Sequence, residues 1–149
     1  MSEPTYPQLQ LDAQLCFPLY AATRAVTREY ARLLAGTGLT YPQYLVMLVL
    51  WEAGEPMSVT EVGARLRLDS GTLTPLLKRL EVTGLVSRRR DTEDERRVLV
   101  EVTETGMAVR EQVVDVPTRL GKAMRMTHAE ALRLRDELTA LIENLDRQM

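Results

Sequence analysis

Apolar residues recur every three or four positions along most of the chain, which is the period of an amphipathic helix. Capping boxes, in which a Ser or Thr is followed three residues later by Glu or Gln, mark helix starts at Thr40, Ser58 and Thr127. Glycines that can end a helix follow several of the apolar stretches. These signals predict helices over about 12–35, 41–53, 58–65, 69–83, 103–121 and 127–147.

One stretch between the fourth and fifth predicted helices alternates with the period of a β-strand instead. Val98, Val100 and Val102 share one face of a strand over 97–102, and residues 85–89 supply its partner. The link 91–95 is acidic and polar, so we expect an exposed turn at the tip of a two-stranded ribbon. The predicted fold class is mainly α with this small β-ribbon: a winged helix-turn-helix with N- and C-terminal dimerisation helices.

The first and last predicted helices carry apolar stripes that lie outside a winged domain of about 40–103. The stripes consist of Leu11, Leu15, Leu19 and Val26 in the first helix and of Leu134, Leu138, Leu141 and Leu145 in the last. Both helices could simply cover the winged domain. We favour dimerisation, because regulators of this fold bind two half-sites through a two-fold axis. We therefore expect one domain over 1–149, with dimerisation helices at about 10–36 and 104–149.

Composition changes this interpretation only where positive charge gathers. The chain has 149 residues, 45% of them hydrophobic, and a net charge of −2, as in one ordinary globular domain. Between residues 65 and 90, however, seven Lys or Arg stand against two Asp or Glu: Arg65, Arg67, Lys78, Arg79, Arg88, Arg89 and Arg90 against Asp69 and Glu81. A solvated face would have the same composition, but within a helix-turn-helix this run favours a nucleic-acid interface.

The helix predicted over 69–83 would enter the major groove with its N-terminal residues. Ser70, Thr72 and Thr74 are small hydroxyl side chains suited to base edges, while Lys78 and Arg79 can reach phosphates. In the wing, Arg96 would enter the minor groove, oriented by Asp94 two residues earlier. The predicted DNA-binding residues are Asp69, Ser70, Gly71, Thr72, Thr74, Pro75, Lys78, Arg79, Arg88, Asp94 and Arg96. Pro75 also predicts a bend, because it removes one helical hydrogen bond.

Other classes of function find little support in the sequence. No apolar run approaches the roughly 18 residues that cross a bilayer, and residues 1–4 do not resemble the start of a signal peptide. With Cys16 as the single cysteine there is no disulfide framework, so we expect a cytoplasmic protein without membrane association. Cys16 and His128 are too far apart to suggest a zinc site, and phosphate- and dinucleotide-binding motifs are missing. We expect no metal, no cofactor and no enzymatic activity, and a surface position for His128.

Motifs across nearly the whole chain resemble the MarR family of transcriptional regulators. Asp91-x-x-Asp94-x-Arg96, followed by Leu-Val-Glu-Val-Thr-Glu-x-Gly106, is similar to the wing and the next helix of that family. Segments that include Leu-Cys-Phe at 15–17, Leu-Thr-Tyr-Pro-Gln-Tyr at 39–44, Leu-Asp-Ser-Gly-Thr-Leu-Thr-Pro-Leu at 68–76 and Val-Asp-Val-Pro at 114–117 resemble the organic hydroperoxide resistance regulators within it. The wing motif is typical of the superfamily, whereas the cysteine and recognition-helix segments together are typical of the subfamily.

The resemblance implies a redox site made of Cys16, Tyr20, Tyr30 and Tyr41, in which the tyrosines orient the thiolate. It implies a homodimeric repressor that binds double-stranded operator DNA, and releases it when an organic hydroperoxide oxidises Cys16, so that a peroxide-detoxifying gene is expressed. Only a thiolate attacks the O–O bond, tyrosine hydroxyls that donate to sulfur favour the thiolate, and the product is a sulfenic acid. On the residues alone, Cys16 would be interpreted as a small buried hydrophobic residue.

Helix geometry separates these tyrosines. Tyr20 is four residues from Cys16, one turn away on the same face. Tyr30 is 14 residues from Cys16, which is about 21 Å along a continuous helix, so it cannot touch the Cys16 of its own chain. An antiparallel partner helix could deliver it, which would make the site a composite of two subunits.

Two features bear on how Cys16 would react. Pro18 differs from the residue that the resemblance implies at this position. If the helix starts at Asp12, Pro18 removes a hydrogen bond in its second turn. If it starts near Cys16, the sulfur lies at a helix N-terminus, whose dipole favours a thiolate. Since the chain has no second cysteine, the resemblance implies the one-cysteine type. In that type a low-molecular-weight thiol forms a mixed disulfide with the oxidised sulfur, or the sulfur is over-oxidised.

Two further functions stay open on the sequence. A MarR-type regulator that answers a non-covalent phenolic or other small ligand would use the same fold without needing Cys16, and release of DNA by peroxide alone would distinguish the two. A thiol peroxidase would consume peroxide catalytically, but a single cysteine beside a basic recognition helix disfavours it.

Overall fold

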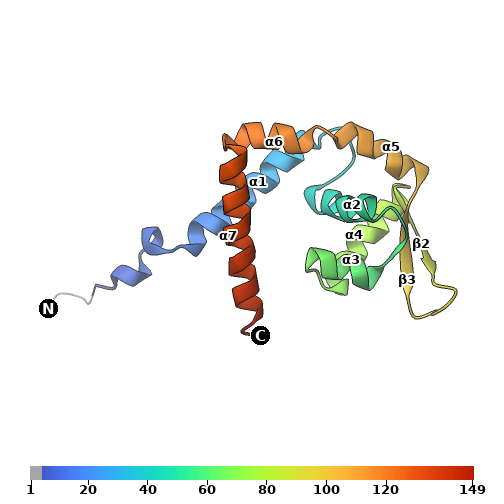
Figure 1. The fold of residues 1–149 in the computed structure, drawn as a ribbon, viewed down its shortest axis with the longest axis horizontal. Helices are drawn as coiled ribbons and strands as arrows, with labels where there is room; N and C mark the ends of the chain where they lie inside the picture. Colours follow the sequence, from blue (N-terminus) through green and yellow to red (C-terminus); the bar gives the residue numbers. More distant parts are fainter. Residues whose placement is uncertain (1–4) are drawn as a thin grey trace. The chain divides into compact units, whose positions relative to one another are not determined.

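Helices make up most of the chain in the computed structural model, which describes residues 5–149 (Figure 1). The chain divides into two units, Met1–Val114 and Asp115–Met149. The first unit contains the short 3-10 helices η1 (Pro7–Leu9) and η2 (Leu11–Ala13), then α1 (Cys16–Leu33), α2 (Tyr41–Ala53), β1 (Met57–Ser58), α3 (Val59–Leu66), α4 (Ser70–Val82), β2 (Val86–Arg90), β3 (Val98–Val102) and α5 (Glu104–Val113). The second contains α6 (Val116–Met124) and α7 (His128–Asp146). Residues 1–4, on which the expectation about a signal peptide rests, lie outside the described residues.

The core of the first unit is built around α2, which is apolar on nearly every side. Val46, Met47 and Leu50 are almost completely buried, and α2 contacts α1, α3, α4, α5 and β3. The indole N–H of Trp51 donates to the carbonyl oxygen of Gly106 at 3.1 Å, which ties α2 to the start of α5. The capping box predicted at Thr40 is present at the start of this helix.

The helix-turn-helix follows from local capping and one close backbone approach. The hydroxyl oxygen of Ser58 accepts the N–H of Glu61, and the Glu61 carboxylate accepts the N–H of Ser58, as predicted for the start of α3. A Cβ on Gly63 would lie 2.8 Å from the carbonyl oxygen of Leu68, so only glycine lets the turn between α3 and α4 fold back this closely. The apolar face of α4 is buried against the core through Leu73, Leu77 and Leu80.

The sheet has three antiparallel strands in the order β1-β3-β2, not the two predicted. β1 has only two residues and pairs with β3, Met57 lying opposite Val100, so no alternation could reveal it in the sequence. The expectation of a fully exposed turn between β2 and β3 is also wrong at one residue. Asp91 is buried, and its carboxylate lies 3.4 Å from the guanidinium of Arg97, whose charge offsets part of the cost of burying it.

Two predicted helices are longer than the helices observed, and in each a proline explains the changed boundary. Residues 12–35 do not form one helix: η2 ends at Ala13, Gln14 is extended, and α1 begins at Cys16. Pro18 therefore lies in the first turn of α1, where its missing N–H costs nothing. The helix predicted over 103–121 is divided into α5 and α6, and Pro117, near the start of α6, has no N–H to continue the helical pattern from Val113.

α1 and α7 both carry exposed apolar side chains. Residues 5–25 are all exposed, and this part of α1 extends away from the winged part of the first unit (Figure 1). Leu15 is 79% exposed, and on α7 the stripe residues Leu134 and Leu145 are 40% and 57% exposed. The capping box at Thr127 starts α7, and His128 is exposed. Within residues 5–149, the helices are too short or too polar to span a membrane.

A substitution at Gly106 tests the packing of α5 on the sheet. A Cβ there would lie 2.1 Å from the carbonyl oxygen of Leu85 and 2.7 Å from Cγ1 of Val102. We expect Gly106→Ala to lower the free energy of unfolding by about 3 kcal/mol in urea denaturation, because both neighbours must move. The exposed Thr105→Ala on the same helix is the control and should change it by less than about 0.5 kcal/mol. Equal stability of the two variants would contradict the close packing.

Candidate nucleic-acid interface and thiol site

The N-terminus of α4 is held by Asp69, one of the predicted DNA-binding residues. One carboxylate oxygen accepts the N–H of Thr72 at 2.8 Å, and the other accepts the Thr72 hydroxyl at 3.2 Å. These hydrogen bonds, first of all the one from the backbone of Thr72, hold the pKa of Asp69 below its usual value, so the carboxylate is charged at neutral pH. Because the Thr72 hydroxyl donates to Asp69, its oxygen offers lone pairs toward solvent.

α4 has one buried and one exposed face, and every DNA-binding residue predicted on this helix lies on the exposed one. These residues are Ser70, Gly71, Thr72, Thr74, Pro75, Lys78 and Arg79. Pro75 stands within the helix at an exposed position, one turn after Gly71, which is also exposed. The Gly71 carbonyl, which lacks its helical donor, therefore lies on the solvent side, which makes the proline tolerable there.

In the wing, Asp94 and Arg96 form the predicted pair, within the turn between β2 and β3. The Asp94 carboxylate accepts the backbone N–H and the Nε–H of Arg96, each at 3.1 Å. Hydrogen bonds from the Arg96 side chain, the largest cause, keep the pKa of Asp94 low. The Arg96 side chain is 92% exposed, so the pair presents a positive group at the surface of the wing.

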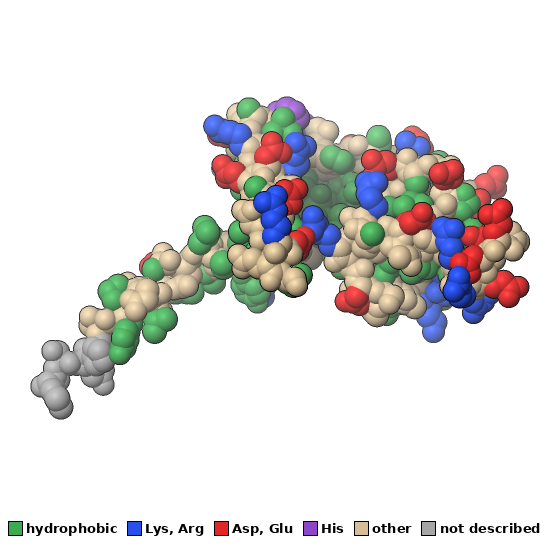
Figure 2. Space-filling view, turned by 60° about the horizontal axis from the view of Figure 1, so that its bottom comes forward, with side chains coloured by type: hydrophobic (Ala, Val, Ile, Leu, Met, Phe, Trp, Pro, Cys, Tyr) green, Lys and Arg blue, Asp and Glu red, His purple; other side chains and the backbone are tan. Residues whose placement is uncertain are grey.

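Three arginines of the basic run 65–90 are bound to other groups of the chain. Arg88, predicted to bind DNA, directs its guanidinium to the Glu81 carboxylate at 2.8 Å and is only partly exposed. Arg90 donates to the carbonyl oxygen of Glu95 at 2.7 Å, and Arg65 pairs with Glu52 at 2.6 Å. Figure 2 shows Lys and Arg side chains gathered at the end of the molecule that carries the wing, interspersed with acidic ones.

Cys16 is the first residue of α1 and is exposed, so within this chain it is not a buried core residue. Its neighbours on the helix are apolar and exposed as well, with Phe17 at 44% and Leu19 at 36%. Tyr20 follows one turn later and is 61% exposed, with the guanidinium carbon of Arg24 lying 5.7 Å from the centre of its ring. The sulfur thus lies at a helix N-terminus in an apolar, uncovered surface, with Tyr20 as the nearest of the three predicted tyrosines.

The other two tyrosines form a pair of their own. The rings of Tyr30 on α1 and Tyr41 on α2 stack with centres 3.9 Å apart and planes 8° apart. The ring of Tyr44 lies 5.6 Å from that of Tyr30, a third member that the sequence analysis did not include, although Tyr44 lies one helical turn from Tyr41. Burial, the largest cause in each case, raises the pKa of all three hydroxyls, that of Tyr30 most strongly. All three are therefore neutral at physiological pH and can donate hydrogen bonds.

The structure does not bring Cys16 together with this tyrosine pair. α1 runs without interruption from Cys16 to Leu33, so Cys16 and Tyr30 are separated by about 21 Å along the helix axis. Of the four residues predicted for the redox site, Cys16 and Tyr20 are neighbours, and Tyr30 and Tyr41 are neighbours elsewhere in the same unit.

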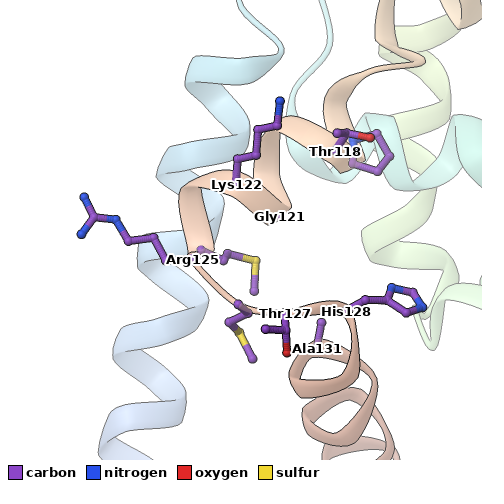
Figure 3. Close-up of a pocket in the computed structure, with 10 residues that line it drawn as sticks. Thr118, Gly121, Lys122, Arg125, Thr127, His128 and Ala131 are labelled. Carbon is purple, nitrogen blue, oxygen red and sulfur yellow. The ribbon is translucent and has the colours of Figure 1, made fainter.

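A separate hollow of about 540 Å³ lies in the second unit, where α6 turns into α7. The labelled basic side chains around it, Lys122, Arg125 and His128, point away from the hollow rather than into it (Figure 3). The hollow therefore has no converging charges for an anion. Within residues 5–149, no three His, Cys, Asp or Glu side chains are grouped so that they could hold a metal ion.

Comparison with known proteins agrees with this arrangement. The family model described as transcriptional regulator SarA/Rot matches residues 30–113. The organic hydroperoxide resistance transcriptional regulator of Bacillus subtilis (strain 168) is 43% identical over 143 residues, which are 96% of this chain and 97% of that protein. The HTH-type transcriptional regulator TtmR of Methylorubrum extorquens (strain PA1) is 51% identical over 135 residues, 91% of this chain and 69% of that protein.

A solved structure extends the similarity to three dimensions. The reduced form of the regulator AbfR, bound to DNA, superposes with a TM-score of 0.77 at 36% identity, over 93% of this chain and 96% of that one; AbfR comes from Staphylococcus epidermidis. These relatives are DNA-binding transcription regulators rather than enzymes. The chain therefore belongs to the MarR family of winged-helix transcriptional regulators, in the group of the organic hydroperoxide resistance regulators, and is a DNA-binding regulator with a single, exposed cysteine.

Proposed function

We propose that the chain, as a homodimer, represses transcription by binding a pseudo-palindromic operator, and that an organic hydroperoxide releases it from DNA by oxidising Cys16. The observation that carries this proposal is the separation of an exposed Cys16, at the start of α1, from the half-buried Tyr30–Tyr41 pair near the end of the same helix. A sensor that needs both parts must take them from two chains.

The uncovered apolar surface around Cys16 supports a second copy as the source of the missing part. Leu15, Phe17 and Leu19 are exposed in the single chain, and their burial against a partner would stabilise a dimer by roughly 1.5–3 kcal/mol for each side chain fully covered. Two α1 helices running antiparallel would place the N-terminal end of one beside the Tyr30 end of the other. The tyrosine hydroxyls keep their protons, so they can donate to a thiolate of the partner.

The chemistry is a two-electron oxidation of sulfur. The Cys16 thiolate attacks the terminal oxygen of the hydroperoxide, an S–O bond forms, and the O–O bond breaks. The alkoxide that leaves takes up a proton to become the alcohol, and Cys16 becomes a sulfenic acid. A low-molecular-weight thiol then displaces water from the sulfenic acid, which leaves a mixed disulfide. Either product puts a polar or bulky group among Leu15, Phe17 and Leu19, which would shift the dimer and separate its two recognition helices from their half-sites.

DNA recognition would use the exposed face of α4 in the major groove and Arg96 in the minor groove. The hydroxyl side chains Ser70, Thr72 and Thr74 are at the N-terminal end of α4, where base edges would lie. Lys78 and Arg79 lie further along the same exposed face and would contact phosphates. AbfR, whose reduced form was solved on DNA, is a precedent for a regulator of this fold bound to DNA.

Substitution of the cysteine separates sensing from DNA binding. Cys16→Ser should bind operator DNA as tightly as the wild type but should not release it when an equimolar organic hydroperoxide is added, because serine forms no sulfenic acid. Fluorescence anisotropy with labelled operator measures both properties, and mass spectrometry of the wild type should show the added oxygen on Cys16. If the Cys16→Ser protein is released as readily as the wild type, the regulator responds to a non-covalent ligand instead.

Mixed dimers test whether the sensor is shared between chains. A dimer of one Cys16→Ser chain and one Tyr30→Phe chain pairs an intact Cys16 with an intact Tyr30 only across the interface. Its cysteine should be oxidised at the wild-type rate, whereas the Tyr30→Phe homodimer should react about tenfold more slowly, because a hydrogen bond to a charged sulfur is lost. Tyr6→Phe, at an exposed tyrosine, is the control and should leave the rate unchanged. A mixed dimer as slow as the Tyr30→Phe homodimer would place the site within one chain.

Substitutions on α4 separate phosphate contacts from base contacts. Lys78→Ala and Arg79→Ala should each weaken binding to all DNA sequences alike and reduce the slope of log affinity against log salt by about one. Thr72→Ala should instead lower discrimination between operator and altered bases by about 1–3 kcal/mol, with the salt slope unchanged. Titrations at several salt concentrations with operator and scrambled DNA measure both effects, and a uniform loss for Thr72→Ala would argue against base recognition.

A further inference from the structure

Glu81, near the end of the recognition helix α4, receives three hydrogen bonds from a single residue of the wing. Its Oε2 accepts the Nε–H of Arg88 at 3.0 Å and an amino group of the same guanidinium at 2.8 Å. Its Oε1 accepts the backbone N–H of Arg88 at 3.2 Å. One carboxylate thus holds both the side chain and the main chain of Arg88 in β2.

The backbone contact has a structural reason. β2 is an edge strand, because the sheet order is β1-β3-β2, and N–H groups on the outer side of an edge strand have no ladder partner. Glu81 supplies that partner for Arg88. The two side chains are 37% and 26% exposed, so water screens this charge-assisted pair less than a pair at the open surface. The pKa of Glu81 is lowered, first by hydrogen bonding to Arg88, and the carboxylate is therefore ionised at neutral pH.

A second contact holds the other arm of the wing. Arg97, just before β3, lies 3.6 Å from the carboxylate of Glu61 on α3 and 3.4 Å from that of Asp91. The base of the wing is therefore joined to α4 through Glu81 and to α3 through Arg97. Arg96, by contrast, has a side chain that is 92% exposed and pairs with Asp94 of the same turn.

We propose that Glu81 is a positioning residue for DNA binding: it fixes the wing relative to α4, so that the wing and the recognition helix meet adjacent grooves of one duplex. Arg88 acts in this contact rather than on DNA. A wing held in its bound orientation loses less conformational freedom on binding, so the preorganised protein binds more tightly. Without Glu81, α4 would still enter the major groove, but Arg96 would reach the minor groove only part of the time.

The sign of the effect of Glu81→Gln distinguishes this proposal from simple electrostatics. Removing a negative charge next to DNA should by itself strengthen binding, whereas loss of the positioning contact should weaken it about tenfold. The full-length protein and its operator are used, with the affinity measured by anisotropy. Glu52→Gln is the matched control, since it removes another helix carboxylate that is paired with an arginine, and it should not weaken binding. Unchanged or tighter binding by Glu81→Gln would overturn the proposal.

A double-mutant cycle with Arg88 completes the test. Arg88→Ala should weaken binding as much as Glu81→Gln, the double variant no more than either, and the salt slope should stay that of the wild type. Hydroxyl-radical footprints should lose protection in the minor groove beside the wing and keep it around the major-groove half-site. The exchanged pair Glu81→Arg with Arg88→Glu should regain part of the affinity. If Arg88→Ala weakens binding more than Glu81→Gln and lowers the slope of log affinity against log salt by about one, Arg88 contacts a phosphate directly. If protection is lost uniformly along the site, the variant has unfolded. Either result refutes the positioning role.

Discussion

Burial of α2 on nearly all sides is the constraint on which the first unit depends. Val46 and Met47 have no exposed surface, and the helix contacts α1, α3, α4, α5 and β3. Since α4 buries its apolar face against this core, the face it leaves outside is polar. The exposed hydroxyl and basic side chains of α4 are thus a consequence of how Leu73, Leu77 and Leu80 are buried. The hydrogen bond from Trp51 to Gly106 ties the start of α5 to the same helix.

The continuity of α1 imposes a different constraint, on sensing. A continuous helix keeps Cys16 and Tyr30 apart however the side chains move, so within one chain the thiol and the tyrosine pair do not meet. The surface around Cys16 is exposed and apolar, whereas the tyrosine pair is half-buried with its hydroxyls protonated. A sensor divided in this way would couple oxidation to the dimer interface directly, since the same residues would form the site and the contact between chains.

Local signals in the sequence predicted well what depends on a few neighbouring residues. The caps at Ser58, Asp69 and Thr127 involve partners only three residues away, and the helix starts at these positions were predicted to within a residue. Pro18 and Pro117 moved helix boundaries that periodicity alone placed elsewhere. Features that depend on more distant partners were not predicted: the two-residue β1, the burial of Asp91 and its ion pair with Arg97, and the place of Tyr44 beside the tyrosine pair. The stacking of Tyr30 on Tyr41 likewise depends on how α1 packs on α2, which no local pattern encodes.

The number of basic residues in the sequence does not by itself define a DNA-binding surface. The run from 65 to 90 has an excess of five positive charges, but Arg65 and Arg88 are paired with carboxylates and Arg90 donates to a carbonyl oxygen. Lys78 and Arg79 stand instead on the exposed face of α4, and Arg96 at the surface of the wing. In this acidic protein, pairing some arginines within the fold leaves a smaller set directed outward, on α4 and on the wing, the two elements proposed to contact DNA. Positive charge would thus serve two purposes: at Arg88 it would fix the wing through Glu81, and at Lys78, Arg79 and Arg96 it would supply the attraction to DNA.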